Sequence, residues 1–141
     1  MDAHPFSITM VNRKGGCGKT STCHQISGCF AHLGYRVLLV DMDPAANLTQ
    51  GFLGPVATEA LPASKTVLSL FDDAYDPDPA EVLLPTRFER ITIFPGSHAL
   101  DDFEAPPTKK AGPLKRALSE FLKEVEGRFD VTIIDCPPNL Q

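Results

Sequence analysis

Short apolar runs recur along this 141-residue chain and are separated by longer segments. The runs lie at 6–11, 36–41, 91–94 and 131–135, and the second and the last of them end in an aspartate. Continuous apolar runs of this length predict strands that are buried on both faces, as in parallel sheets. The pattern therefore predicts four buried strands, two of which end in a carboxylate.

Helical patterns occupy much of the sequence between these strands. One helix is predicted over 18–33, ahead of Gly34, and an amphipathic helix is predicted to open at Pro113 and to stop at Gly127. Segment 54–90 is a variable region rich in proline and acidic residues, with short helices predicted at 66–71 and 79–84.

Alternation of strands and helices predicts an α/β fold with a doubly wound, mostly parallel sheet flanked by helices. In such folds, ligands bind beyond the carboxyl ends of the strands. The candidate chemistry is therefore expected where the apolar runs end.

A glycine-rich run, Lys14-Gly-Gly-Cys-Gly-Lys-Thr20, follows the first predicted strand and opens the first helix. Its glycines allow backbone N–H groups to converge on an anion at the start of a helix, which is how P-loops hold phosphates. Lys19 is placed to reach the outer phosphates, and the Thr20 hydroxyl to bind Mg²⁺. The run departs from the general P-loop pattern, because Arg13 stands where the first glycine would be and Lys14 adds a lysine.

Aspartates follow two of the predicted strands at the same expected sheet edge. Asp135 has the placement of a Walker B carboxylate, whereas Asp41 and Asp43 are candidates to support a metal and orient an attacking water. Either of the latter two could instead cap a turn before Pro44. Phosphoryl transfer to water needs charge neutralisation, a metal and a positioned water, so the set predicts a P-loop NTPase.

Composition restricts the protein class further. The net charge is −5, most acidic side chains lie in the second half, and there is no basic patch suited to nucleic acid. The absence of a signal pattern and of a long apolar run predicts a cytoplasmic protein with no evident membrane segment. The four cysteines form no C-x-x-C pair, which favours reduced, small buried side chains over a disulfide framework or a metal cluster.

Four motifs together resemble one known family. They are Lys14–Thr20, Val37–Asn47, Ile93–Ser97 and Ile133–Leu140, and in this order they are similar to the deviant Walker A ATPases of the ParA partitioning family, in the ParA/MinD superfamily. The resemblance implies ATP and Mg²⁺ as cofactors and a homodimer that sandwiches ATP. It also implies a ParB-like activator and, through a C-terminal region missing from this chain, non-specific DNA binding.

The resemblance also implies roles for individual residues. Lys14, Lys19 and Asp43 would be catalytic, with Lys14 reaching the nucleotide of the partner subunit, and Asn47 would belong to a switch region. The metal would be bound by Thr20, Asp43 and Asp135. The nucleotide-binding set would be Lys14, Gly15, Gly16, Cys17, Gly18, Lys19, Thr20 and Ser21.

Relatives in this family continue for on the order of a hundred further residues. Residues 1–141 are therefore expected to be the N-terminal portion of a single P-loop ATPase domain, and strand 6–11 to be an exposed apolar edge. The implied function is ATP hydrolysis that switches a homodimer to partition or position DNA or other cargo. The alternative is a truncated, hydrolysis-deficient nucleotide-binding regulator or interaction module.

Overall fold

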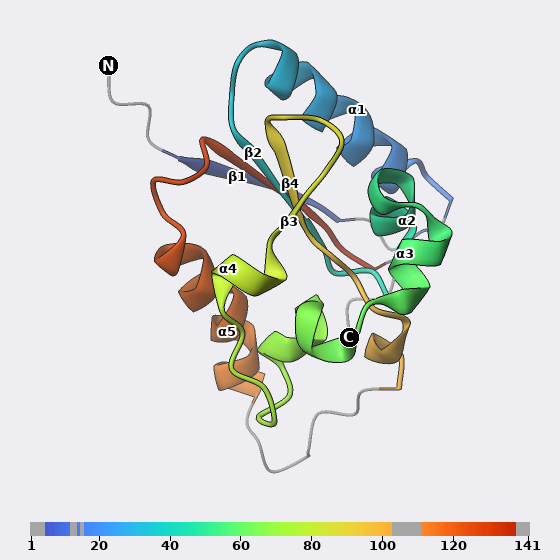
Figure 1. Cartoon of the computed structure of the whole chain (residues 1–141), viewed down its shortest axis with the longest axis vertical. Coiled ribbons are helices and arrows are strands. Elements are labelled where there is room, and N and C mark those ends of the chain that lie inside the picture. Colours follow the sequence, from blue (N-terminus) through green and yellow to red (C-terminus); the bar gives the residue numbers. More distant parts are fainter. Residues whose placement is uncertain (1–4, 12–13, 15, 103–110, 138–141) are drawn as a thin grey trace.

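A five-stranded sheet forms the centre of the computed structural model, which describes residues 5–11, 14, 16–102 and 111–137. Its strand order is β1-β5-β2-β4-β3, and every pairing is parallel except that of β3 with β4 (Figure 1). The strands are β1 (Phe6–Met10), β2 (Val37–Asp41), β3 (Leu84–Pro85), β4 (Ile91–Phe94) and β5 (Val131–Asp135).

Helices cover both faces of this sheet, as Figure 1 shows. Helices α1 and α2 pack on one face and α5 on the other, which confirms the predicted doubly wound α/β fold. No helix in the described ranges is long and apolar enough to cross a membrane. The helices are α1 (Lys19–His32), α2 (Asn47–Leu53), α3 (Pro55–Ala60), α4 (Pro79–Val82) and α5 (Ala111–Glu124), with 3₁₀ turns at Ala63–Lys65, Val67–Leu70 and His98–Leu100.

Strand β2 runs through the middle of the core, and all five of its residues are buried. Val37 and Leu39 pack on the face covered by α1 and α2, whereas Leu38 and Val40 pack on the face covered by α5. Because successive side chains point to opposite faces, a strand covered on both sides must be apolar throughout. This explains why the sequence pattern located β2 to within one residue.

The remaining predicted elements differ from the structure in detail. Strand β1 ends at Met10, so Val11 lies outside it, and the expected helices at 66–71 and 79–84 are a 3₁₀ turn and a single helical turn. Strand β3 and helices α2 and α3 were not predicted. Elements as short as these carry too few periodic positions to be recognised from sequence.

Helix α5 begins at Ala111, and the prediction that it opens at Pro113 was wrong by two residues. Proline lacks an N–H group, but the N–H groups of the first helical turn have no partner within the helix. Proline can therefore occupy any position of that turn, and its presence does not identify the first helical residue.

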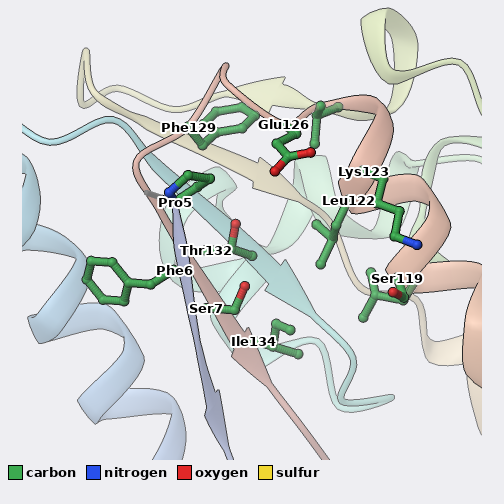
Figure 2. Close-up of a pocket in the computed structure, with 12 residues that line it drawn as sticks. Pro5, Phe6, Ser7, Ser119, Leu122, Lys123, Glu126, Phe129, Thr132 and Ile134 are labelled. Carbon is green, nitrogen blue, oxygen red and sulfur yellow. The ribbon is translucent and has the colours of Figure 1, made fainter. Parts of the chain in front are cut away.

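Strand β1 is an edge of the sheet within the described residues, as predicted (Figure 1). Phe6 and Val11 are about half exposed, at 46% and 51%. A groove of about 590 Å³ lies between the strand pair β1–β5 and helix α5. Figure 2 shows Ser7, Thr132 and Leu122 along this groove, whereas Phe6 points towards α1 on the other face.

The cysteines divide into two groups. Cys23 is fully buried against the sheet, and burial together with the nearby Asp135 and Asp41 carboxylates raises its pKa to about 12, so its thiol stays protonated. Cys17 and Cys29 are exposed, so the prediction of small buried side chains was wrong for these two. All four cysteines are free thiols.

Candidate functional site

The chemistry-bearing residues meet at the carboxyl ends of the central strands. Met10 at the end of β1 is in register with Asp135 at the end of β5, and Asp135 is in register with Asp41 at the end of β2. The glycine-rich run follows β1, and the segment that contains Asp43 follows β2. Parallel pairing therefore brings motifs separated by about a hundred residues to one edge.

The glycine-rich run ends at the N-terminus of α1. Gly18 precedes the helix with φ 84°, in the left-handed region that glycine occupies without strain, and no side chain in the described part of the protein caps the helix. The N–H groups of the first helical turn thus have no capping side chain as acceptor. With the positive end of the helix dipole, they form a surface suited to a phosphate.

A cavity of about 300 Å³ opens beside this loop. It brings together most of the predicted nucleotide-binding residues with two residues that follow β2, Asp43 and Asn47. Lys14 is exposed and does not line this cavity, and Gly15 lies outside the described residues. The lining residues are Gly16, Cys17, Gly18, Lys19, Thr20, Ser21, Asp43 and Asn47.

Asp135 is buried and only half satisfied by hydrogen bonds. The Thr20 hydroxyl donates to its Oδ2 at 2.7 Å, whereas its Oδ1 is buried and has no hydrogen-bond partner among the described residues. Burial raises the pKa of Asp135, the Thr20 hydrogen bond opposes this, the Asp43 carboxylate raises it further and Lys19 lowers it. A buried carboxylate oxygen without a donor is suited to a cation, and oxygen ligands beside a threonine hydroxyl fit Mg²⁺.

Asp41 is also buried, but donors surround its carboxylate. Its Oδ2 accepts hydrogen bonds from Thr49 N at 2.9 Å and Thr49 Oγ1 at 2.6 Å, and its Oδ1 accepts from Asp43 N at 3.2 Å. Burial raises its pKa to about 6, against the lowering effect of the Thr49 hydrogen bonds. Asp41 does not line the cavity. Its contacts therefore favour the turn-capping alternative over a role in orienting an attacking water.

Asp43 takes part both in the turn after β2 and in the lining of the cavity. Its Oδ1 accepts a hydrogen bond from Ala45 N at 3.0 Å, which closes a turn, and its side chain also lines the cavity. Asp41 is the last residue of β2 and Asp43 follows it after one residue, so the strand pattern alone did not show which of the two lines the cavity.

Sequence reasoning gave no role to two residues of this edge, Thr49 and Gly96, although Gly96 lies within the motif Ile93–Ser97. Thr49 is fully buried and connects Asp41 to Gly96, whose N–H donates to Thr49 Oγ1 at 2.8 Å. The available signal was the Pro-Gly pair that ends β4 at the same edge as the aspartates. A threonine inside a short helix gave no signal at all.

Comparisons with known proteins agree with this arrangement. Residues 6–141 match the AAA domain family AAA_31. The sporulation initiation inhibitor protein Soj of Bacillus subtilis is 35% identical over 136 residues, which cover 94% of this chain and 50% of Soj. The chromosome partitioning protein ParA of Caulobacter vibrioides is 29% identical over 145 residues, covering 99% of this chain and 51% of ParA.

The chain belongs to the ParA family of partitioning ATPases. This confirms the family resemblance of its motifs. Among solved structures, the cobyrinic acid a,c-diamide synthase of Mycobacterium smegmatis, with a bound ATP analogue and magnesium, aligns with a TM-score of 0.78 and 33% identity. The alignment covers 96% of this ParA-family chain and 52% of that protein. The chain thus spans about half the length of the relatives it matches.

Proposed function

We propose that this chain binds Mg²⁺–ATP at the cavity beside the glycine-rich loop and hydrolyses it. Hydrolysis would switch a homodimer that positions DNA or other cargo. A solved relative holds an ATP analogue with magnesium, which supports the choice of ligand. Membership of the ParA family supports the switching role.

The observation that carries the proposal is the pairing of Thr20 with Asp135. A P-loop threonine and the carboxylate of a neighbouring strand lie at hydrogen-bond distance, and one oxygen of that carboxylate has no donor within the described part of the chain. A bound magnesium ion would neutralise phosphate charge and polarise the terminal phosphoryl group. Thr20 and Asp135 would hold it, with Asp43, which lines the same cavity, as the third candidate ligand.

The other site residues have distinct tasks in this proposal. Lys19, at the first position of α1, places a positive charge beside the phosphates, and the N–H groups of the helix start donate to their oxygens. Asp43 would orient the attacking water, because its carboxylate lines the cavity from the opposite segment. Asn47 lines the same cavity at the start of α2 and would sense the outer phosphate.

Lys14 supports the dimeric part of the proposal. It is exposed and stands outside the lining of its own cavity. By the family resemblance, Lys14 would reach the nucleotide of a second subunit. The ParB-like activator and the cargo are carried over from the family alone.

The proposal is tested by measuring nucleotide binding and ATP turnover for the chain, with and without Mg²⁺. Wild type is expected to bind a fluorescent ATP analogue in a Mg²⁺-dependent way and to release phosphate. Lys19→Ala should lose turnover, because the charge that neutralises the phosphoryl oxygens is removed. Lys65→Ala, on an exposed lysine of a 3₁₀ turn, is a matched control that should change neither quantity.

The two function classes give different results in this experiment. Mg²⁺-dependent binding with a phosphate-release rate that Lys19→Ala does not change would reject the enzyme and favour the nucleotide-binding regulator. Absence of binding in both variants would reject both.

A further inference from the structure

Thr49 is the centre of a buried hydrogen-bond network outside the cavity. Its backbone N–H and its hydroxyl both donate to Asp41 Oδ2, and the hydroxyl oxygen accepts from Gly96 N–H. All three groups are buried, and the sequence separation between Thr49 and Gly96 is 47 residues. One hydroxyl therefore joins the ends of β2 and β4 to the first turn of α2.

The atoms of Gly96 and Asp41 are closely packed in this network. A Cβ atom on Gly96 would lie 2.9 Å from Asp41 Cγ and 3.1 Å from the Asp41 carbonyl oxygen. Atoms essentially never approach this closely, so only glycine fits between the end of β4 and the carboxylate. The Asp41 carboxylate is thus fixed by hydrogen bonds on one side and by backbone contact on the other.

The same carboxylate holds both ends of the segment that faces the cavity. At its beginning, Asp43 N–H donates to Asp41 Oδ1, and at its end Thr49 donates to Asp41 Oδ2. Between them the chain turns sharply, with Ala46 N–H donating to the Asp43 carbonyl oxygen at 2.9 Å and Ala46 at φ 52°. Asp43 and Asn47, the two cavity residues of this segment, therefore lie within a loop closed on Asp41.

We propose that Thr49 is a positioning residue: by joining Asp41 to Gly96, its hydroxyl holds Asp43 and Asn47 in the arrangement that serves the phosphate site. The inference rests on the proposed function of that site. Thr49 itself lies away from the cavity lining and acts only through the loop it closes. Without the hydroxyl, Gly96 N–H and Asp41 Oδ2 each lose a partner, and the segment is released from β4.

The test compares Thr49→Val, which keeps the shape but removes the hydroxyl, with Thr49→Ser, which keeps the hydroxyl. Thr58→Val is the matched control, because Thr58 is also buried but its hydroxyl bonds to the Gly54 carbonyl at the start of its own helix. For each variant, ATP affinity, ATP turnover and amide hydrogen exchange over residues 42–50 are measured.

Thr49→Val is expected to lower turnover by at least about tenfold while changing ATP affinity by less than about threefold, since misplaced groups slow the reaction more than they weaken phosphate binding. Its amides over 43–47 should exchange faster than in wild type. Thr49→Ser should restore both properties, and Thr58→Val should match wild type in both.

Hydrogen exchange separates failure of this inference from failure of the proposed function. If wild type shows no turnover, faster exchange over 43–47 in Thr49→Val alone still supports the positioning role. Unchanged exchange in a folded Thr49→Val protein would overturn it, as would an equal loss of turnover in Thr58→Val. If Thr49→Val does not fold, Thr49→Ala, which also removes the hydroxyl, is measured in its place with the same expectations.

Discussion

Asp41 and Asp135 are neighbours in register at one sheet edge, yet they have opposite surroundings. Three donors surround Asp41, whereas the described residues supply Asp135 with one donor on Oδ2 and none on Oδ1. Burial raises the pKa of both carboxyl groups. A satisfied buried carboxylate organises the protein around it, and a half-satisfied one is prepared for a ligand.

Removal of the Asp135 charge should have the largest effect of the changes considered. Asp135→Asn keeps an oxygen to accept from Thr20 but loses a cation ligand, so Mg²⁺-dependent ATP affinity is expected to fall more than about 100-fold. The free energy of unfolding without Mg²⁺ should not fall, because a buried charge with a single donor is removed. Isothermal titration with and without EDTA and urea unfolding measure the two effects. Mg²⁺-dependent binding at wild-type strength would contradict the assignment of Asp135.

The pH dependence of the free energy of unfolding tests how Asp41 contributes to stability. Its pKa is about 6 in the folded protein, against an ordinary value of 3.8, so the folded state holds its proton more tightly than the unfolded state. Its contribution to stability is fully present below pH 4 and lost as pH rises through 6, by about 3 kcal/mol. Urea unfolding of Asp135→Asn between pH 4 and 8, without nucleotide, removes the titration of Asp135 itself. The loss should be smaller in this variant, because the Asp135 charge also raises the pKa of Asp41.

Thr49→Val offers an internal check on that pH dependence. Thr49→Val removes a donor to Asp41 and so raises the pKa of Asp41 further. When Thr49→Val is added to Asp135→Asn, the loss of stability should therefore extend to higher pH than in Asp135→Asn alone. A pH profile that is the same with and without Thr49→Val would mean that the hydroxyl does not act on Asp41.

Gly96→Ala tests how tightly Asp41 is enclosed. The added methyl group would contact the Asp41 carboxylate at about 3 Å, and the surrounding hydrogen bonds prevent the carboxylate from moving away. We expect the free energy of unfolding to fall by about 1–3 kcal/mol, measured by urea denaturation. Gly28→Ala is the control, because a Cβ there meets no atom of the described residues within 4 Å. An equal effect at both glycines would argue against close packing at Asp41.

A partly exposed carboxylate provides the smallest expected effect. Asp130 pairs with Arg36 at 2.9 Å on the surface, and the Arg36 side chain is half exposed. The guanidinium lowers the pKa of Asp130, but solvent and salt weaken such pairs. Arg36→Ala should leave the melting temperature unchanged within error at physiological salt, by differential scanning calorimetry. A large decrease would show that paired surface carboxylates matter more here than buried ones.

Much of the fold was recoverable from the sequence because burial on both faces leaves a plain signal. The apolar runs at 91–94 and 131–135 coincide with β4 and β5, and helix α1 falls within its predicted range. Short elements such as α2 and β3 were missed because their position depends on packing and not on periodicity. Proline in the first turn of α5 misplaced that helix start by two residues.

The candidate site was recoverable only in part, for the same reason. Lys19, Thr20 and Asp135 follow from motif and strand pattern, and Thr20 and Asp135 do meet in the structure. Thr49 lies outside the four motifs and Gly96 lies within Ile93–Ser97 without a predicted role, so their contacts appear only once β2, α2 and β4 are packed together.

The sequence by itself determined the α/β class, the glycine-rich loop and the candidate carboxylates, since glycine spacing and continuous apolar runs are local properties of the chain. Only the tertiary structure decided which buried carboxylate is satisfied. Asp41 and Asp135 both end apolar strands, and the strand pattern does not show which of the two carboxylates receives donors. Donors to a buried oxygen come from segments distant in sequence, so hydrogen-bond satisfaction is fixed only when the sheet and its loops assemble.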